Sequence, residues 1–227
     1  EAAVETSAEL NGYSGFSASN NLSRASDADW DVLGTGAAYL SFWFKTSSIG
    51  TPSMMAGFHN SGSTIRFDVY MDAVGTVTGV DDGATAQGYV VSPETYQDDV
   101  WHKCDWLRVS STERHLYVDG ILSGSSTTDA GSISSSGNLP FYLGVSAADG
   151  SSYPASTTTL SLVHLSATAP TATQIRQMYD AEKGMFVASA ECLLQSGSTD
   201  AVIDVDVDPL TSKVLVTQTD AITIFDG

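Results

Sequence analysis

Two strands and a tight turn can be read in one stretch of the sequence, 100-VWHKCDWLRVSSTERHLYVDGIL-122. Apolar and polar residues alternate in its second half, so that Leu116 and Val118 face the same side of a strand. Asp119 and Gly120 follow as a turn signal, because glycine adopts a positive φ at no steric cost. The stretch therefore predicts an antiparallel hairpin with one buried face.

The same period of two extends over most of the chain. The run 39-YLSFWFK-45 places Leu40, Phe42 and Phe44 on one wholly apolar face, as in a strand that covers a core. Many short strands at this spacing predict an all-β, two-sheet antiparallel sandwich. Further strands are expected at 53–59, 64–71, 74–80, 87–91, 139–145 and 157–166, with turn signals at 60–63, 81–83 and 149–150.

The composition limits the classes of partner. The chain has 227 residues, and 42% of them are hydrophobic, which is enough to bury the core of a sandwich. With 9 Lys and Arg against 27 Asp and Glu, its formal net charge is −18. This charge excludes a nucleic-acid partner and disfavours an anionic membrane surface. No apolar run reaches the roughly 18 residues that a membrane span needs, so no membrane insertion is expected.

One helix is predicted, at 171-TATQIRQMYDAEK-183. Thr171 and Gln174 have the spacing of a capping box at its start. Ile175 and Met178 fall on one side of the helix, and we interpret that apolar stripe as core packing.

The order of these features resembles the concanavalin A-like jelly rolls, specifically laminin-G-like domains. The resemblance rests on 22-LSRASDADWDVLGTGAAYLSFWFKT-46, on the hairpin quoted first, and on 159-TLSLVHLSATAPTATQI-175. It covers residues 10–187 and implies a domain at 1–187, a two-sheet jelly roll that ends in one short C-terminal helix. Trp43, Trp101 and Trp106 are large enough to fill the space between two such sheets.

A narrower resemblance concerns 178-MYDAEKGMF-186 and the tail that follows it. These features are similar to modules in structural proteins of tailed bacteriophages. This resemblance implies a non-enzymatic virion appendage protein, a tail fibre or tail-associated protein that presents its jelly roll for host-surface or glycan attachment. Two alternatives stay open: a purely structural virion module, such as a capsid decoration or fibre shaft, and an extracellular carbohydrate-binding module of a secreted polysaccharide-active protein.

The segment 188–227 has a different pattern and predicts a second, smaller element. Its strands at 200–209, 213–219 and 221–227 form a β-meander that resembles a single propeller blade. Such a sheet has two open edges and an apolar face that it cannot bury alone. It therefore packs on the jelly roll, pairs with another copy of the chain or is the start of a longer array. We expect a homo-oligomer, with a trimer favoured, and contacts with other virion proteins.

The sequence contains no arrangement typical of catalysis. Glycosidases need paired carboxylates on one strand face, but the Glu residues stand isolated. Asp204, Asp206 and Asp208 share a face, which we interpret as the solvated side of a strand. The four His residues form no nucleophile motif, and no phosphate loop is present. The chain is therefore expected not to be an enzyme.

Binding residues are predicted from their chemistry and their position near loops. Sugar binding uses exposed aromatic rings beside hydrogen-bonding groups, which points to Tyr89, Tyr96 and Tyr153, although each also suits packing. Trp30 suits a sugar platform or the core equally well. The jelly-roll resemblance implies Ca²⁺ at loops on a sheet edge. The candidate ligands are Asp81, Asp82 and Asp149, with Asp98, Asp99 and Asp27 or Asp29 as further carboxylates. Each of these turns also forms without a metal.

The two cysteines, Cys104 and Cys192, indicate neither a disulfide scaffold nor a zinc site. A reduced, buried Cys104 is expected, and a bridge between the two residues is the alternative.

Overall fold

The computed structural model describes residues 12–25, 36–47, 50–59, 66–83, 86–131, 140–146, 150–186, 202–208, 210, 213–219 and 221–225. The chain divides into two compact units. The larger is Leu10–Lys183, and the smaller contains the C-terminal strands.

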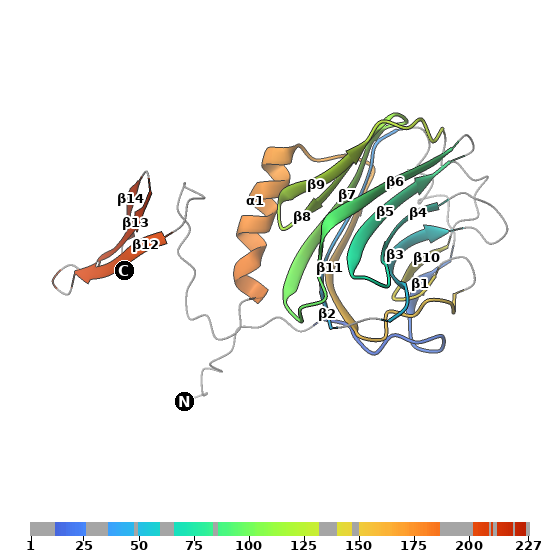
Figure 1. Ribbon diagram of the computed structural model, residues 1–227, viewed down its shortest axis with the longest axis horizontal. Coiled ribbons are helices and arrows are strands. Elements are labelled where there is room, and N and C mark those ends of the chain that lie inside the picture. Colours follow the sequence, from blue (N-terminus) through green and yellow to red (C-terminus); the bar gives the residue numbers. More distant parts are fainter. Residues whose placement is uncertain are drawn as a thin grey trace. The chain divides into compact units, whose positions relative to one another are not determined.

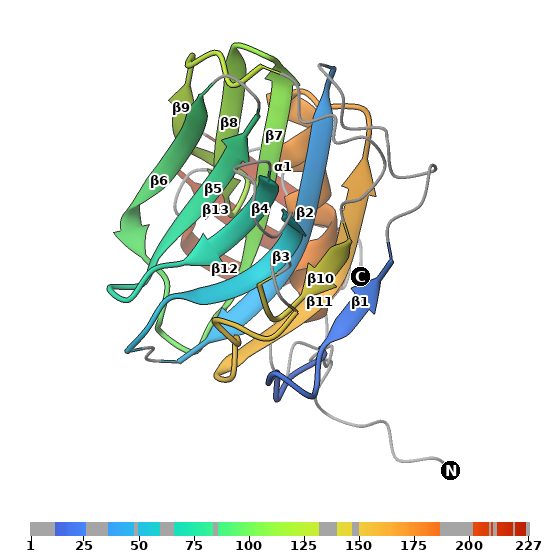
Figure 2. The same cartoon turned by 90° about the vertical axis from the view of Figure 1, so that its right-hand side faces the viewer.

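The larger unit is a sandwich of two antiparallel sheets (Figures 1 and 2). One sheet has six strands in the order β1 (Leu22–Arg24), β10 (Phe141–Leu143), β3 (Ser53–His59), β4 (Arg66–Met71), β5 (Thr76–Asp82) and β6 (Gln87–Thr95). The other has five strands in the order β11 (Thr158–Ser166), β2 (Ala38–Thr46), β7 (Trp101–Ser110), β8 (Glu113–Val118) and β9 (Ile121–Ser126). The predicted all-β, two-sheet antiparallel jelly roll is confirmed.

The alternation along β2 and β7 decides which side chains fill the space between the sheets. Phe42 and Phe44 point into it from β2, and Trp106 does so from β7. Trp106 stacks on Phe67 with ring centroids 6.0 Å apart. It also packs on the backbone of Gly79, where any Cβ would overlap the indole ring. Gly79 is therefore required by this close approach of the two sheets.

Trp43 and Trp101 do not fill the space between the sheets, so that prediction is wrong for both. Side chains of a strand point to alternate faces, and Trp43 lies between two inward-pointing phenylalanines. It therefore faces outward, where its ring stacks on Tyr179 at a centroid separation of 5.7 Å. Trp101 pairs with Lys45 in the β2–β7 register and shares that outer face.

The predicted helix is confirmed as α1 (Ala172–Glu182), which continues into a short 3₁₀ helix, η2 (Lys183–Phe186). The capping box is present: the Gln174 N–H donates to the Thr171 hydroxyl at 3.3 Å, and the Thr171 N–H donates to the Gln174 carboxamide oxygen at 2.8 Å. In the part of the chain that is described, no helix has the length and apolar character needed to cross a membrane.

Helix α1 covers the outer face of the five-stranded sheet (Figure 1). Its buried Ile175 packs against Tyr39 and Leu107 of that face. Beside this apolar contact, Lys103 Nζ lies 2.8 Å from Glu182 Oε2, and the Trp43 indole N–H donates to the same oxygen at 2.6 Å. Lys103 is almost fully buried, and a buried charge is costly without a partner of opposite charge. Glu182 of α1 supplies that partner, so this ion pair fixes the helix on strand β7.

A buried ionic cluster joins the two sheets at one end of the sandwich. Asp81 of β5 accepts from Arg108 of β7 and from Arg114 of β8, with Arg108 Nη1 3.2 Å from the carboxylate. All three side chains have no exposed surface. The turn predicted at 81–83 begins too early in the sequence, because Asp81 and Asp82 are still the last two residues of β5.

The smaller unit contains a three-stranded antiparallel sheet in the order β12 (Val202–Asp208), β13 (Lys213–Gln218) and β14 (Ile222–Phe225). Asp204 and Asp206 are exposed on one face of β12, as predicted for a solvated strand face. Val205 and Val207 on the opposite face are also more than half exposed. The predicted homo-oligomer, which was inferred from such an apolar face, stays a prediction.

Cys104 is a free thiol in the core between the sheets. Burial raises its pKa well above the usual range, so the thiol stays protonated and unreactive. The reduced, buried Cys104 that was expected is therefore the state found, in place of the alternative bridge; Cys192 itself lies outside the described residues.

We expect the variant Asp81→Ala to lose about 3–5 kcal/mol of unfolding free energy, because two guanidinium groups would stay buried without their carboxylate. Urea denaturation at neutral pH measures this loss. The exposed Asp206→Ala serves as the control and should change stability by no more than about 0.5 kcal/mol. Equal stability of the two variants would show that the buried cluster does not hold the sheets together.

Candidate functional site

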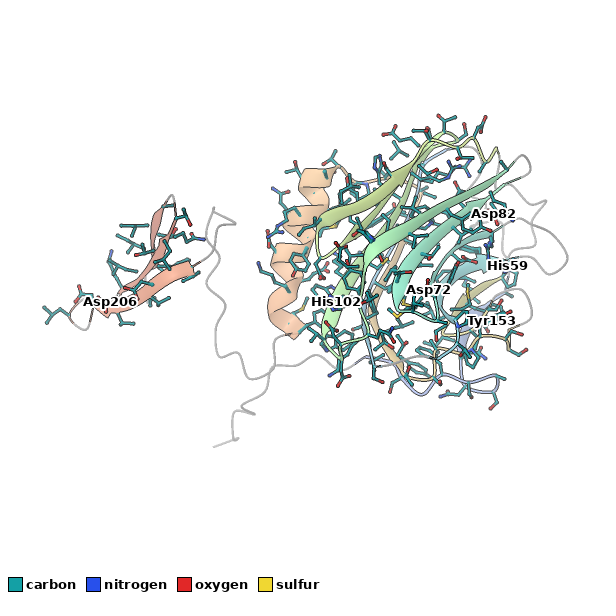
Figure 3. The ribbon with its side chains drawn as sticks, in the orientation of Figure 1. His59, Asp72, Asp82, His102, Tyr153 and Asp206 are labelled. Carbon is teal, nitrogen blue, oxygen red and sulfur yellow. The ribbon has the colours of Figure 1, made fainter. Side chains whose placement is uncertain are left out.

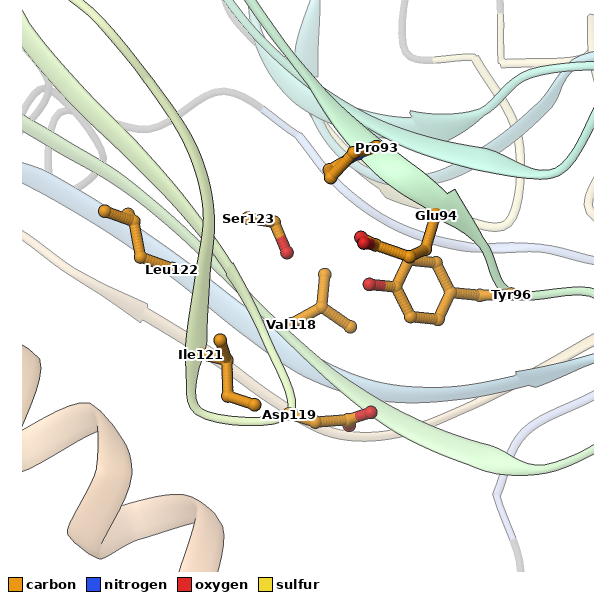
Figure 4. A pocket seen from close by; sticks show the side chains of 8 residues that line it. All are labelled: Pro93, Glu94, Tyr96, Val118, Asp119, Ile121, Leu122 and Ser123. Carbon is orange, nitrogen blue, oxygen red and sulfur yellow. The ribbon is translucent and has the colours of Figure 1, made fainter.

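A groove lies where the edge strands of the two sheets approach each other. β6 ends the six-stranded sheet, β9 ends the five-stranded sheet, and the two strands are in contact. The groove between them has a volume of about 250 Å³ (Figure 4). It is lined by Pro93, Glu94 and Tyr96 from the β6 side and by Val118, Asp119, Ile121, Leu122 and Ser123 from the β8–β9 hairpin.

The tight turn of the β8–β9 hairpin shapes one wall of the groove. Asp119 and Gly120 both have positive φ angles, of 53° and 72°, as a two-residue hairpin of this kind requires. The turn predicted from the Asp-Gly pair is therefore confirmed. The next two residues, Ile121 and Leu122, are 63% and 49% exposed, so two large aliphatic side chains offer apolar surface at the groove.

Tyr96 forms the opposite wall and is the one predicted tyrosine that lines the groove. Its ring packs edge-on against Phe44 and His102, with centroid separations of 6.3 and 4.9 Å. Figure 4 shows its hydroxyl turned toward Glu94 and Ser123. Burial raises the pKa of Tyr96; a hydrogen bond from Ser123 opposes this rise, whereas the nearby charge of Glu94 adds to it.

Asp119 is held at the groove by two hydrogen bonds. One carboxylate oxygen accepts from the backbone N–H of Lys103 at 2.9 Å, and the other lies 2.7 Å from Nδ1 of His102. The Nε2 atom of the same imidazole is 3.2 Å from Asp98. Burial lowers the pKa of His102, but the hydrogen bonds and charges of Asp119 and Asp98 outweigh it and raise the pKa overall.

Tyr89, the second predicted tyrosine, lies on the outer face of the six-stranded sheet and not in the groove. Arg66 donates to its hydroxyl at 3.0 Å, and the guanidinium carbon lies 5.5 Å from the ring centroid. The same guanidinium donates to Asp82 at 2.9 Å. Asp68, in the middle of this cluster, is fully buried, and neither of its carboxylate oxygens has a hydrogen-bond partner.

Tyr153, the third predicted tyrosine, lies in a loop whose backbone meets β3. Its carbonyl accepts from the Met54 N–H at 2.9 Å, its φ is 52°, and its side chain is 56% exposed. Figure 3 shows Tyr153 and Asp82 at separate places, both away from His102. The three predicted tyrosines therefore do not form one site.

The structure does not bring the predicted calcium ligands together. Asp81 and Asp82 are bound to arginines and lie on opposite faces of β5, and Asp149 lies outside the described residues, as do Asp27, Asp29 and Trp30. Among the residues that are described, no group of three or more His, Cys, Asp or Glu side chains is placed to hold a metal ion. A calcium site stays a prediction that a thermal melt with and without EDTA tests.

The chain was compared with known families and structures. A family model described as the Concanavalin A-like lectin/glucanases superfamily matches residues 17–176. A search of curated protein sequences found no match.

Solved structures share the fold at low sequence identity. The sialidase module CBM40 of Ruminococcus gnavus, bound to α2,3-sialyllactose, is 13% identical with a TM-score of 0.56, over 70% of this chain and 96% of that one. The NanB sialidase from Streptococcus pneumoniae is 15% identical with a TM-score of 0.58, over 90% of this chain and 32% of that one. The binding domain of Paraclostridial Mosquitocidal Protein 1 is 8% identical with a TM-score of 0.54, over 82% of this chain and 50% of that one.

The unpartnered Asp68 makes the stability of the fold depend on pH. Burial raises its pKa to about 7 from an ordinary value of 3.8, an effect that Arg66 opposes and Asp82 reinforces. The folded state therefore holds the proton more tightly than the unfolded chain, and stability falls as the pH rises from about 4 to about 7. We expect Asp68→Asn, which carries no charge at any pH, to remove this part of the dependence.

At pH 8 the Asp68→Asn variant should be more stable than the wild type by about 1–4 kcal/mol, and at pH 4 the two should be nearly equal. Urea denaturation across this range measures the difference. The pKa of Asp105 is also raised by burial, to about 6, and this residue is present in both proteins. Subtracting the wild-type plot of stability against pH from that of the variant therefore removes the contribution of Asp105 to the pH dependence. A constant difference at every pH would contradict the assignment to Asp68.

Proposed function

The chain belongs to the Concanavalin A-like lectin/glucanases superfamily, and from that premise we propose that its jelly roll is a carbohydrate-binding module that holds a sugar in the groove between β6 and the β8–β9 hairpin. The observation that carries the proposal is the lining of this groove. It combines an aromatic ring, two carboxylates, hydroxyl groups and exposed aliphatic side chains.

This lining matches the chemistry of a sugar. Sugar hydroxyls donate hydrogen bonds, and the carboxylates of Glu94 and Asp119 are strong acceptors for them. The C–H faces of a sugar ring are apolar, and Ile121 and Leu122 offer apolar surface beside those acceptors. Because Asp119 is already fixed by His102 and by the backbone of Lys103, little ordering is needed when a ligand binds.

We assign the groove to binding and not to hydrolysis. A glycosidase needs one carboxyl group free to donate a proton and a second free to attack or to activate water. Both oxygens of Asp119 already interact, one with a backbone N–H and one with His102, which keeps this carboxylate an acceptor. The R. gnavus module bound to sialyllactose supports a binding role, since it shares the fold over 96% of its length.

Carbohydrate binding agrees with the third of the functions expected from the sequence, a module of an extracellular polysaccharide-active protein. We propose an extracellular place of action on the same ground. The bacteriophage virion appendage, with its tail fibre, homotrimer and virion partners, stays a prediction, as does the purely structural virion module. Immunogold labelling of phage particles with an antibody to this chain tests both virion roles.

We expect the labelled full chain to bind on a glycan array, and two groove variants to bind the selected glycan more weakly. Tyr96→Phe keeps the ring against Phe44 but removes one hydrogen-bonding group, which should weaken binding by about fivefold to tenfold. Leu122→Ser removes exposed apolar surface and should weaken binding by about fivefold. Isothermal titration calorimetry measures both affinities.

Tyr153→Phe is the matched control, since Tyr153 is exposed but lies outside the groove, and it should bind as the wild type does. An array on which no glycan is retained would refute the proposed function. Wild-type affinity in both groove variants would place the binding site elsewhere on the jelly roll.

A further inference from the structure

The charges that line the groove are all of one sign. Glu94 and Asp119 contribute carboxylates, and no Lys or Arg is among the eight lining residues. The inference below rests on the proposed function and concerns the charge of the sugar that the groove accepts.

Every cation of the chain can be located, because all nine Lys and Arg lie within the described residues. Six of them form ion pairs within the fold: Arg66, Lys103, Arg108, Arg114, Arg176 and Lys183. Arg24 on β1 and Lys45 on β2 lie on strands that do not line the groove, and Lys213 on β13 belongs to the smaller unit. No lysine or arginine of the larger unit therefore lines the groove, where it could bind a carboxylate or sulfate group of a ligand.

His102 does not change the sign of the charge at the groove. His102 lies between Asp98 and the groove residue Asp119, so one imidazole faces two carboxylates. Even when it is protonated, this trio keeps one net negative charge, and Glu94 adds another. The groove is thus electronegative.

We propose that the groove selects its ligand by charge: it accepts a sugar that carries a free amino group and rejects sugars that carry a carboxylate or a sulfate. An ammonium group would donate hydrogen bonds to Glu94 and Asp119, which are the two acidic residues among the eight that line the groove. A sugar carboxylate in the same place would face like charges with no lysine or arginine to pair with. The preference would be opposite to that of the R. gnavus module, which is bound to the acidic sialyllactose.

The expected size of the effect follows from the attraction between opposite charges. The amide N–H of an acetylated sugar is a neutral donor to these carboxylates, whereas an ammonium group adds the attraction of a full positive charge. For two unit charges about 4 Å apart near water, this attraction corresponds to an affinity ratio of roughly fivefold to tenfold. The general field of a chain with a net charge of −18 also attracts cations, so it must be separated from the effect of the groove. At about 0.15 M salt the Debye length is about 8 Å, which screens distant charges and leaves those of the groove.

The test is a calorimetric titration of the full chain with three probes at about 0.15 M salt, at a pH where the sugar amine is protonated. The probes are a glucosamine trimer, the N-acetylglucosamine trimer of equal length, and α2,3-sialyllactose. We expect the glucosamine trimer to bind about fivefold to tenfold more tightly than its acetylated form. Sialyllactose should bind more weakly than either trimer.

Two variants, each with one negative charge fewer than the wild type, test whether the preference for the amine depends on the groove. Glu94→Gln changes the groove, and the preference for the amine should fall by about threefold or more. Asp206→Asn changes an exposed residue of β12 and should keep the wild-type preference. A preference that is unchanged in Glu94→Gln, or that falls equally in both variants, would overturn the proposal, as would tighter binding of sialyllactose.

The same measurements distinguish an error in the charge selectivity from an error in the proposed function. If acidic or neutral sugars bind best and Tyr96→Phe weakens that binding, the groove is a sugar site and only its charge selectivity is wrong. If no probe and no glycan on an array binds, the proposed function itself is wrong.

Discussion

The buried carboxylate of Asp81 holds two guanidinium groups, and the packing of the sandwich depends on this cluster. Arg108 and Arg114 belong to one sheet and Asp81 to the other, so the ion pairs cross the space between them. The arginines also donate to the backbone carbonyls of Ser111, Thr128 and Gly131. Because the desolvation of three charges is costly, the cluster tolerates little displacement, and it fixes the two sheets relative to each other at this end.

Burial of charged side chains leaves the negative excess of the chain almost unchanged at the surface. The chain has only 9 basic residues against 27 acidic ones. Three of these cations, Lys103, Arg108 and Arg114, are buried and paired within the domain. Four carboxylates, Asp68, Asp81, Asp82 and Asp105, are buried as well, so the exterior keeps nearly the whole negative excess of the chain. The groove is negative as well, since its lining contains two carboxylates and no lysine or arginine.

Helix α1 restricts where a ligand can approach the sandwich. It seals the outer face of the five-stranded sheet through the contacts of Ile175 and through the bonds of Glu182 to Lys103 and Trp43. On the outer face of the six-stranded sheet, the guanidinium of Arg66 lies over the Tyr89 ring, and the nearby Asp68 is buried. The groove at the sheet edges combines exposed aliphatic side chains, a tyrosine ring and two carboxylates in one hollow.

The sequence by itself determined the strands, the capped helix and the Asp-Gly turn, because these depend on side-chain alternation and on the conformational preferences of neighbouring residues. It also singled out Tyr96, which lines the groove. It did not reveal that Asp81 and Asp82 pair with arginines, nor that Glu94 and Asp119 line the same groove. Those contacts join residues far apart in the chain and, for Asp81 and the groove, in different sheets, and no local pattern encodes them. Only the tertiary structure, which sets the two sheets face to face, decided that Asp81 pairs with two arginines and that Glu94 and Asp119 line a groove without a lysine or arginine.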